Sequence, residues 1–123
     1  MKSVLIAAAL ALSPLPVLAG AAHADDVMAS AYGNTTVATG GMFETRTHYN
    51  ADHTFTMTIP ERNAEMKGTW SLDGANVCRT FEAPPPGVPN PLCTPVEAHK
   101  VGDTWTVRTP AGPRTVTLVA GIK

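Results

Sequence analysis

Apolar and polar residues alternate strictly in the segment Thr54–Ile59, where threonine occupies every second position. A period of two is the pattern of a β-strand that buries one face and exposes the other. Residues 104–108 and 115–122 alternate in the same way. We therefore expect these segments to share one core, formed by Phe55, Met57, Ile59, Trp105, Val107, Val116, Leu118 and Ile122.

Weaker strand patterns complete a chain of short β-elements, at residues 34–39, 42–50, 67–73 and 77–83. Turn residues separate them at hairpin spacing, as in Gly40-Gly41 and in residues 51–53, 73–76 and 111–113. Apart from a short helical turn at 25–31, no segment after residue 24 favours a helix. The chain is thus predicted to be all-β: an antiparallel meander of six to eight strands that closes, or nearly closes, into a small barrel.

The interior of so small a barrel has two possible uses. With about eight strands, it is just wide enough to be filled by side chains or to hold one small ligand. Trp70 and Trp105 are either core anchors or, with Phe55 and Met57, the walls of a ligand pocket. The sequence favours the core for the tryptophans but leaves a pocket open.

The first residues have the pattern of a secretory signal peptide. A basic residue, Lys2, precedes an apolar run at 4–12, and Ala22-His-Ala24 has the small-x-small form of a cleavage site. Val17-Leu-Ala19 is a competing site, and Ala29-Ser-Ala31 is a weaker one. The apolar run is too short for a transmembrane helix. We expect residues 1–24 to be removed and residues 25–123 to form one soluble domain, in the periplasm or outside the cell.

Two cysteines, Cys78 and Cys93, bracket the most unusual segment of the chain. In an exported protein they predict one structural disulfide. Residues 83–92 between them cannot join a sheet, because proline fixes φ and lacks a donor. This loop is either a stiff solvated connection or a preorganised surface for a protein partner. The residues that would contact such a partner are Pro84, Pro85, Pro86, Val88, Pro89 and Pro91.

Composition excludes several classes of function. The formal charge is −1 at pH 7 and the basic residues are scattered, so a nucleic-acid partner is not expected. There is no Gly-x-Ser-x-Gly motif, no phosphate-binding glycine loop and no cofactor motif. Glu61 and Glu65 lie beside Arg62 and Lys67, which favours a solvated loop over an acid–base pair. We expect neither an enzyme nor a cofactor.

His48, Asp52 and His53 crowd one predicted turn and raise the question of a metal site. Zinc and copper prefer such side chains, but His48 ends one strand and His53 begins the next. Their side chains need not converge, and His99 is the one further histidine after residue 24. We expect a polar turn, in which Asp52 accepts hydrogen bonds from nearby backbone, and no metal.

Several short motifs follow one another in a characteristic order along the chain. These are Ala31-Tyr-Gly-Asn-Thr-Thr-Val37, Tyr49-Asn-Ala-Asp-His-Thr-Phe55, Gly68-Thr-Trp70, Cys78, Cys93-Thr-Pro95, Val101-Gly-Asp-Thr-Trp105 and Val116-Thr-Leu-Val-Ala-Gly121. In this order the chain resembles a group of small, uncharacterised exported proteins of Gram-negative bacteria, and its scheme is similar to lipocalin-like barrels. The resemblance implies a fold and export but no activity. The chain departs from the group at His53, where glycine is more usual.

These observations lead to two hypotheses about function. The favoured one is a non-enzymatic protein, with a structural role or with a small apolar ligand inside the barrel. The alternative is a protein-interaction module that uses the proline-rich loop 83–92. A carrier requires an open cavity beside the tryptophans, whereas an interaction module requires a filled barrel from which the loop projects.

Overall fold

A computed structural model describes residues 26–123, and it is an all-β structure of eight antiparallel strands. The predicted signal peptide at 1–24 lies outside the described residues. The strands are β1 (Thr35–Thr39), β2 (Thr45–Tyr49), β3 (Thr54–Ile59), β4 (Ala64–Asp73), β5 (Asn76–Phe81), β6 (Leu92–Pro95), β7 (Thr104–Thr109) and β8 (Gly112–Val119). Two short 3₁₀ helices accompany them, η2 (Asp26–Ala31) before β1 and η3 (Pro60–Arg62) between β3 and β4.

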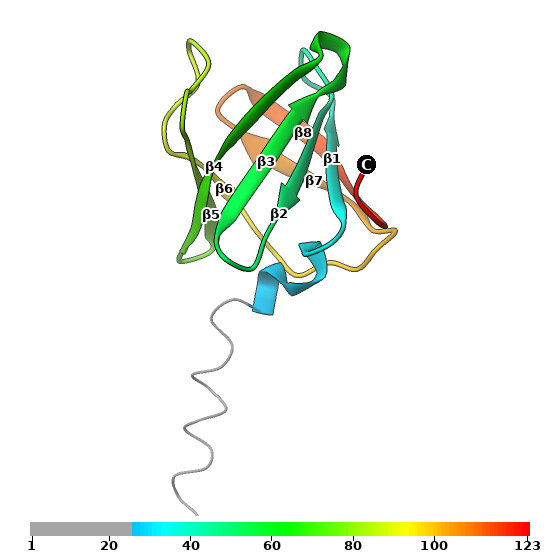
Figure 1. Ribbon diagram of the computed structural model, residues 1–123. Helices are drawn as coiled ribbons and strands as arrows, with labels where there is room; N and C mark the ends of the chain where they lie inside the picture. The colour runs from blue at the N-terminus through cyan, green and yellow to red at the C-terminus, as the bar shows by residue number, and fades with distance from the viewer. Residues whose placement is uncertain (1–25) are drawn as a thin grey trace, which may run out of the picture.

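The strands form a nearly closed barrel (Figure 1). β1 to β6 pair in chain order as a meander, and the hairpin of β7 and β8 returns so that β8 pairs with β1. β6 and β7 lie in contact, but the sheet order ends at these two strands, so a seam remains between them. The predicted all-β meander, with its near-closure into a barrel and its disulfide, is confirmed.

The strand β6 was not among the predicted strands. Its four residues, Leu92–Pro95, show no alternation and lie among prolines. Their pairing comes from the neighbouring strand, because Cys78 stands directly opposite Cys93 in the ladder of β5 and β6. The predicted disulfide joins these two residues, whose Cα atoms are 4.0 Å apart. It holds the short β6 against β5 on the face opposite Val77 and Arg79.

One predicted core residue, Ile122, lies at the surface with 64% of its area exposed. The strand β8 ends at Val119, before the alternation of the sequence ends. Gly121 then adopts a φ of 78°, and its carbonyl oxygen accepts a hydrogen bond from the hydroxyl of Thr35. The chain therefore turns outward before Ile122, and the prediction for this residue was wrong. Phe55, Val116 and Leu118 are buried as expected.

An aromatic cluster fills the interior beside β3 and β4. Tyr49, Phe55, Trp70 and Phe81 are all buried, and Met28 from η2 packs against them. The rings of Phe55 and Phe81 meet edge to face at 5.3 Å, and those of Tyr49 and Trp70 at 6.2 Å. Because η2 lies across this end of the barrel (Figure 1), the cluster closes the interior there.

Gly68 gives the cluster the room that it needs. It lies on β4 between Phe55 and Phe81, its partners in the neighbouring strands. A Cβ atom at this position would overlap the carbonyl oxygen of Thr80 and approach the Phe55 ring to 2.9 Å. The absence of a side chain therefore lets β4 and β5 approach closely beneath the two phenylalanine rings.

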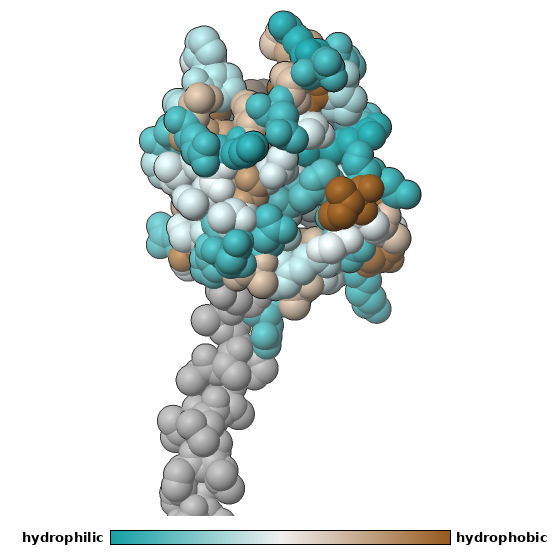
Figure 2. All heavy atoms as spheres, viewed as in Figure 1, coloured by the Kyte–Doolittle hydropathy of each residue, from teal (hydrophilic) through white to brown (hydrophobic). Residues whose placement is uncertain are grey.

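The outer surface is mostly polar on the face shown in Figure 2. Among the described residues, the large hydrophobic side chains that remain exposed are those of Met42, Val101 and Ile122. Within residues 26–123, no helix is both long enough and apolar enough to cross a membrane.

Candidate ligand cavity inside the barrel

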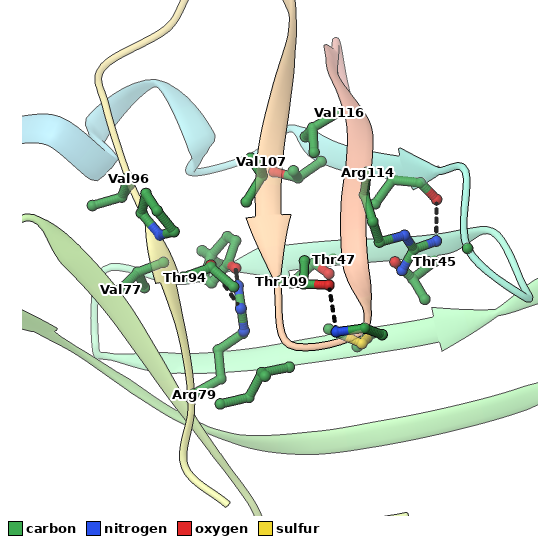
Figure 3. A pocket seen from close by; sticks show the side chains of 18 of the residues that line it. Thr45, Thr47, Val77, Arg79, Thr94, Val96, Val107, Thr109, Arg114 and Val116 are labelled. Atoms are coloured by element: carbon green, nitrogen blue, oxygen red, sulfur yellow. Dashed lines mark hydrogen bonds between the residues drawn. The ribbon is translucent and has the colours of Figure 1, made fainter. Parts of the chain in front are cut away.

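The barrel contains a cavity of about 660 Å³. Its lining residues come from all eight strands, and Figure 3 shows the side chains of a part of them. Most are apolar, such as Met57, Val77, Val107, Val116 and Leu118. The volume lies within the range of about 300–1,000 Å³ that is usual for small-molecule sites. The interior is thus filled in part by the aromatic cluster and is hollow in part.

Of the four residues predicted to line a pocket, two do so and two do not. Trp105 and Met57 belong to the cavity wall. Trp70 and Phe55 are 2% and 1% exposed, and they lie in the aromatic cluster. The Trp70 indole N–H donates to the carbonyl of Asn50 at 3.0 Å, and the His53 ring stacks on it with centroids 4.0 Å apart. Trp70 is therefore a core anchor, and Trp105 is the tryptophan of the cavity.

The proline-rich loop contributes to the same cavity. Pro85, Pro86, Val88 and Pro89 line it, and Val88 packs against the core cluster, whereas Pro84 and Pro91 are exposed outside it. This loop lies at the end of the barrel opposite η2 (Figure 1). It forms part of the cavity rim in addition to presenting prolines to solvent.

The side chain of Asn90 holds the loop in place. Its Oδ1 accepts a hydrogen bond from the Phe81 N–H at 2.8 Å, and its Nδ2 donates to the Phe81 carbonyl at 3.3 Å. A pair of bonds to one residue's backbone imitates a β-ladder partner, so Asn90 extends the pairing of β5 beyond Leu92. The loop is clamped by this contact and by the disulfide, and its rim residues are therefore well positioned.

Arg79 is the most unusual residue of the cavity. It lies on β5 at an inward position between Val77 and Phe81, and it is 8% exposed. Its guanidinium donates to the Tyr49 hydroxyl at 2.7 Å and to the Thr94 hydroxyl at 2.9 Å. Its Nε–H is buried and has no hydrogen-bond partner. A buried charge held by neutral oxygens alone is costly, because the dipoles replace only part of its hydration.

A second arginine, Arg114, reaches the cavity from β8 (Figure 3). Its Nη2 donates to the carbonyl oxygens of Ala38 and Phe43, and its Nε has no partner. Burial lowers the pKa of the Arg114 guanidinium from its usual value. The two backbone bonds show that Arg114 also fixes the connection between β1 and β2.

The cavity carries few compensating negative charges. Among the described residues that line the cavity, Glu97 carries the sole carboxylate, and Glu97 is exposed. The ion pairs of the described residues join Arg46 to Glu44 and, when its imidazole is protonated, His99 to Asp103. Neither involves Arg79 or Arg114. The interior therefore has an excess of positive charge, whereas the whole chain carries a formal charge of −1.

A smaller hollow of about 280 Å³ lies at the seam between β6 and β7. Trp105 and His99 belong to both hollows, and their rings stack with centroids 3.4 Å apart. His99 Nδ1 lies 3.4 Å from a carboxylate oxygen of Asp103. This contact ties the segment before β7 to the cavity wall.

The three histidines of the described segment lie in different surroundings. His48 is on the face of β2 opposite Thr47 and Tyr49, whereas His53 stacks on Trp70 and His99 on Trp105. Within residues 26–123, no three His, Cys, Asp or Glu side chains gather in a way that would hold a metal ion. Asp52 accepts from the backbone N–H and the hydroxyl of Thr54, at 3.0 and 2.6 Å, as in the predicted polar turn.

His53 occupies this turn with a φ of 71°, a left-handed conformation that favours glycine. Its ring contact with Trp70 accompanies this conformation. A residue with a side chain therefore occupies this tight turn.

Arg79 was not among the predicted site residues, although the sequence carries a signal for it. Val77, Arg79 and Phe81 alternate with Cys78 and Thr80, so a period-two reading of β5 places an arginine among inward apolar residues. Arg114 occupies the equivalent inward position before Val116 and Leu118 on β8. A charged residue on the apolar face of a strand is the pattern that identifies both arginines as candidate site residues.

Comparisons with protein-family models, with curated proteins and with solved structures found no match to this chain.

Proposed function

We propose that the protein is an exported, non-enzymatic binding protein that holds one small, mainly apolar ligand inside a lipocalin-like barrel. The observation that carries this proposal is the cavity of about 660 Å³ with its largely apolar wall. A small domain gains stability from a well-packed interior, and an unfilled apolar volume forfeits contacts that packing would supply. A ligand would restore those contacts, which is a physical reason for the barrel to remain hollow.

The place of the proline-rich loop supports the same function over the alternative. An interaction module would have a filled barrel and a loop that projects from it. Here Pro85, Val88 and Pro89 line the cavity, and Asn90 clamps the loop to Phe81. We therefore assign the loop to the rim of the ligand site, where it would limit the entry of water.

Export to the periplasm or the outside of the cell is supported by two features. The pattern at residues 1–24 is that of a signal peptide, and the bond between Cys78 and Cys93 suits an oxidising compartment. Fractionation of cells that express the full chain tests this part. We expect a shortened protein that begins at Asp25 in the exported fraction, and full-length protein confined to the cytoplasm would contradict it.

A neutral fluorescent probe tests whether the cavity binds ligands. N-phenyl-1-naphthylamine should gain fluorescence with the oxidised 25–123 protein and saturate at one molecule per chain. Val107→Trp, which fills the cavity, should abolish this gain. Thr106→Trp is the matched control, because the neighbouring side chain points outward from β7 and is exposed. Saturable binding that survives Val107→Trp, or no binding at all, would contradict the proposal.

A further inference from the structure

The guanidinium of Arg79 is an incomplete binding site. A guanidinium has five N–H donors, and Arg79 uses one on each terminal nitrogen, towards Tyr49 and Thr94. The Nε–H is buried and has no acceptor. Removing so strongly polar a group from water without an acceptor is costly, so the arrangement calls for a further partner.

Among the described residues, no negatively charged side chain pairs with the Arg79 guanidinium. Tyr49 and Thr94 are neutral, and the carboxylate of the cavity wall, Glu97, belongs to an exposed residue beyond the end of β6. Arg79 is in neither of the ion pairs formed by the described residues. The second guanidinium, that of Arg114, adds a like charge to the same cavity. A negative group placed there would be attracted by both.

We propose that the ligand is an amphipathic carboxylate, whose head group binds Arg79 and whose apolar chain fills the cavity. This inference rests on the proposed function and specifies its ligand class. A planar guanidinium matches the two oxygens of a carboxylate through two parallel hydrogen bonds. The Nε–H and the remaining N–H of a terminal nitrogen are the donors for such a pair.

The two hydroxyl contacts orient Arg79 for this role. Tyr49 comes from β2 and Thr94 from β6, so they hold the guanidinium from two sides of the barrel. Figure 3 shows the Arg79 side chain extending from β5 towards Thr94, next to Val77. Val77, Val107, Val116 and Leu118 are the apolar surface available to the chain of the ligand. Arg114 is engaged by two backbone carbonyls, so Arg79 is the head-group site.

The test compares two ligands that differ in the head group alone. Isothermal titration calorimetry of the oxidised 25–123 protein with decanoate and with 1-decanol measures the contribution of the carboxylate. Because hydrogen bonds to a buried charge are strong, decanoate should bind roughly tenfold more tightly or better. Decyltrimethylammonium, which carries the opposite charge, should bind more weakly than 1-decanol.

Two variants assign the preference to Arg79. Arg79→Met keeps an apolar side chain of similar length, and it should bind decanoate and 1-decanol equally. Arg108→Met is the matched control, since Arg108 is exposed and adjoins the inward Val107, and it should retain the preference. The comparison of ligands on the unaltered protein does not depend on the folding of either variant.

The possible outcomes separate this inference from the function on which it rests. If the unaltered protein binds decanoate and 1-decanol with equal affinity, the carboxylate assignment is overturned and the apolar binding function stands. If it binds neither, both are overturned. If Arg79→Met is folded by circular dichroism and keeps the preference for decanoate, the assignment to Arg79 is overturned.

Discussion

The Tyr49 hydroxyl accepts a hydrogen bond of 2.7 Å from the Arg79 guanidinium, across a barrel interior that separates strands β2 and β5. This contact joins the aromatic cluster to the cavity. Tyr49 packs against Phe55 and Trp70 through its ring and presents its hydroxyl to the charge. Tyr49 is thus one of the side chains, with Met28 and Phe81, that belong both to the core cluster and to the cavity wall.

Removal of that hydroxyl should destabilise the protein. Tyr49→Phe leaves a buried, charged donor without one of its two acceptors, for which we expect a loss of about 1–3 kcal/mol in the free energy of unfolding. Urea denaturation measures it. In an Arg79→Met background the same substitution should cost much less, because the charge is gone. Equal losses in the two backgrounds would show that the hydrogen bond contributes little.

Arg79 itself should reduce stability in the absence of ligand. Replacement of a buried ion pair by apolar side chains of similar volume is often neutral or stabilising by about 1–4 kcal/mol, and Arg79 has no charged partner that its replacement would leave unpaired. We therefore expect Arg79→Met to unfold at the same or a higher urea concentration than the unaltered protein. A clear loss of stability would mean that the neutral contacts compensate the buried charge fully, and it would weaken the argument that a ligand is required.

The two tryptophans should differ in their contribution to stability. Trp70 is 2% exposed, so Trp70→Ala should cost about 3–5 kcal/mol. Trp105 is half-buried and lines the cavity, so Trp105→Ala should cost distinctly less. Thr106→Ala, at an exposed neighbouring position, should stay within about 0.5 kcal/mol. Urea melts of the three variants give the order, and an equal loss for Thr106 and Trp70 would contradict the register of the strands.

Gly68 provides a test of the packing beneath the phenylalanine rings. A methyl group there would overlap the Thr80 carbonyl, so Gly68→Ala should cost at least about 1–3 kcal/mol. Thr69→Ala changes the exposed neighbouring position and serves as the control. Denaturation curves of both variants are compared with the parent curve. If Gly68→Ala were as stable as Thr69→Ala, the result would contradict the close packing of β4 against β5 at Gly68.

The Asp52 turn predicts a defined dependence on pH. Hydrogen bonds from the Thr54 hydroxyl and backbone N–H lower the pKa of Asp52 below its usual value of 3.8. Because the folded pKa is the lower one, the contribution to stability is complete above the usual value and is lost as the pH falls through the folded pKa. Melting temperatures between about pH 5 and pH 2.5 should therefore fall less steeply for Asp52→Asn than for the unaltered protein. If the melting temperatures of the two proteins fell equally steeply with pH, the lowered pKa of Asp52 would be contradicted.

The sequence predicted the fold correctly where apolar and polar side chains alternate. The prediction failed where backbone geometry determines the end or the pairing of a strand. The alternation of threonine with Phe55 and Met57 predicted the bounds of β3 correctly. The alternation at Val116 and Leu118 predicted correctly that these two side chains are buried. β6 has no such pattern, because the disulfide and the ladder of β5 position it. At the C-terminus, the left-handed turn at Gly121 ends the pattern before Ile122.

The candidate site was predictable only in part. Aromatic and apolar residues are equally suited to a core and to a cavity wall, so the sequence could not separate Trp70 from Trp105. In the structure, Trp70 packs in the core cluster with Met28 of η2, a contact that the strand pattern does not show. The inward arginines were predictable from the strand period. The neutral surroundings of Arg79 were not predictable, because they depend on how the nearly closed barrel brings β2, β5 and β6 around its guanidinium.

The most direct test of a ligand inside the barrel uses the two tryptophans as separate reporters. The chain contains only these two, so Trp70→Phe leaves Trp105 as the single source of tryptophan emission. Titration with decanoate should then change the emission of Trp105 saturably, at one molecule per chain, because this indole lines the cavity. In the Trp105→Phe variant, the emission of Trp70 should change far less, since Trp70 is enclosed in the aromatic cluster. An unchanged Trp105 emission, or a response confined to Trp70, would contradict binding in this cavity.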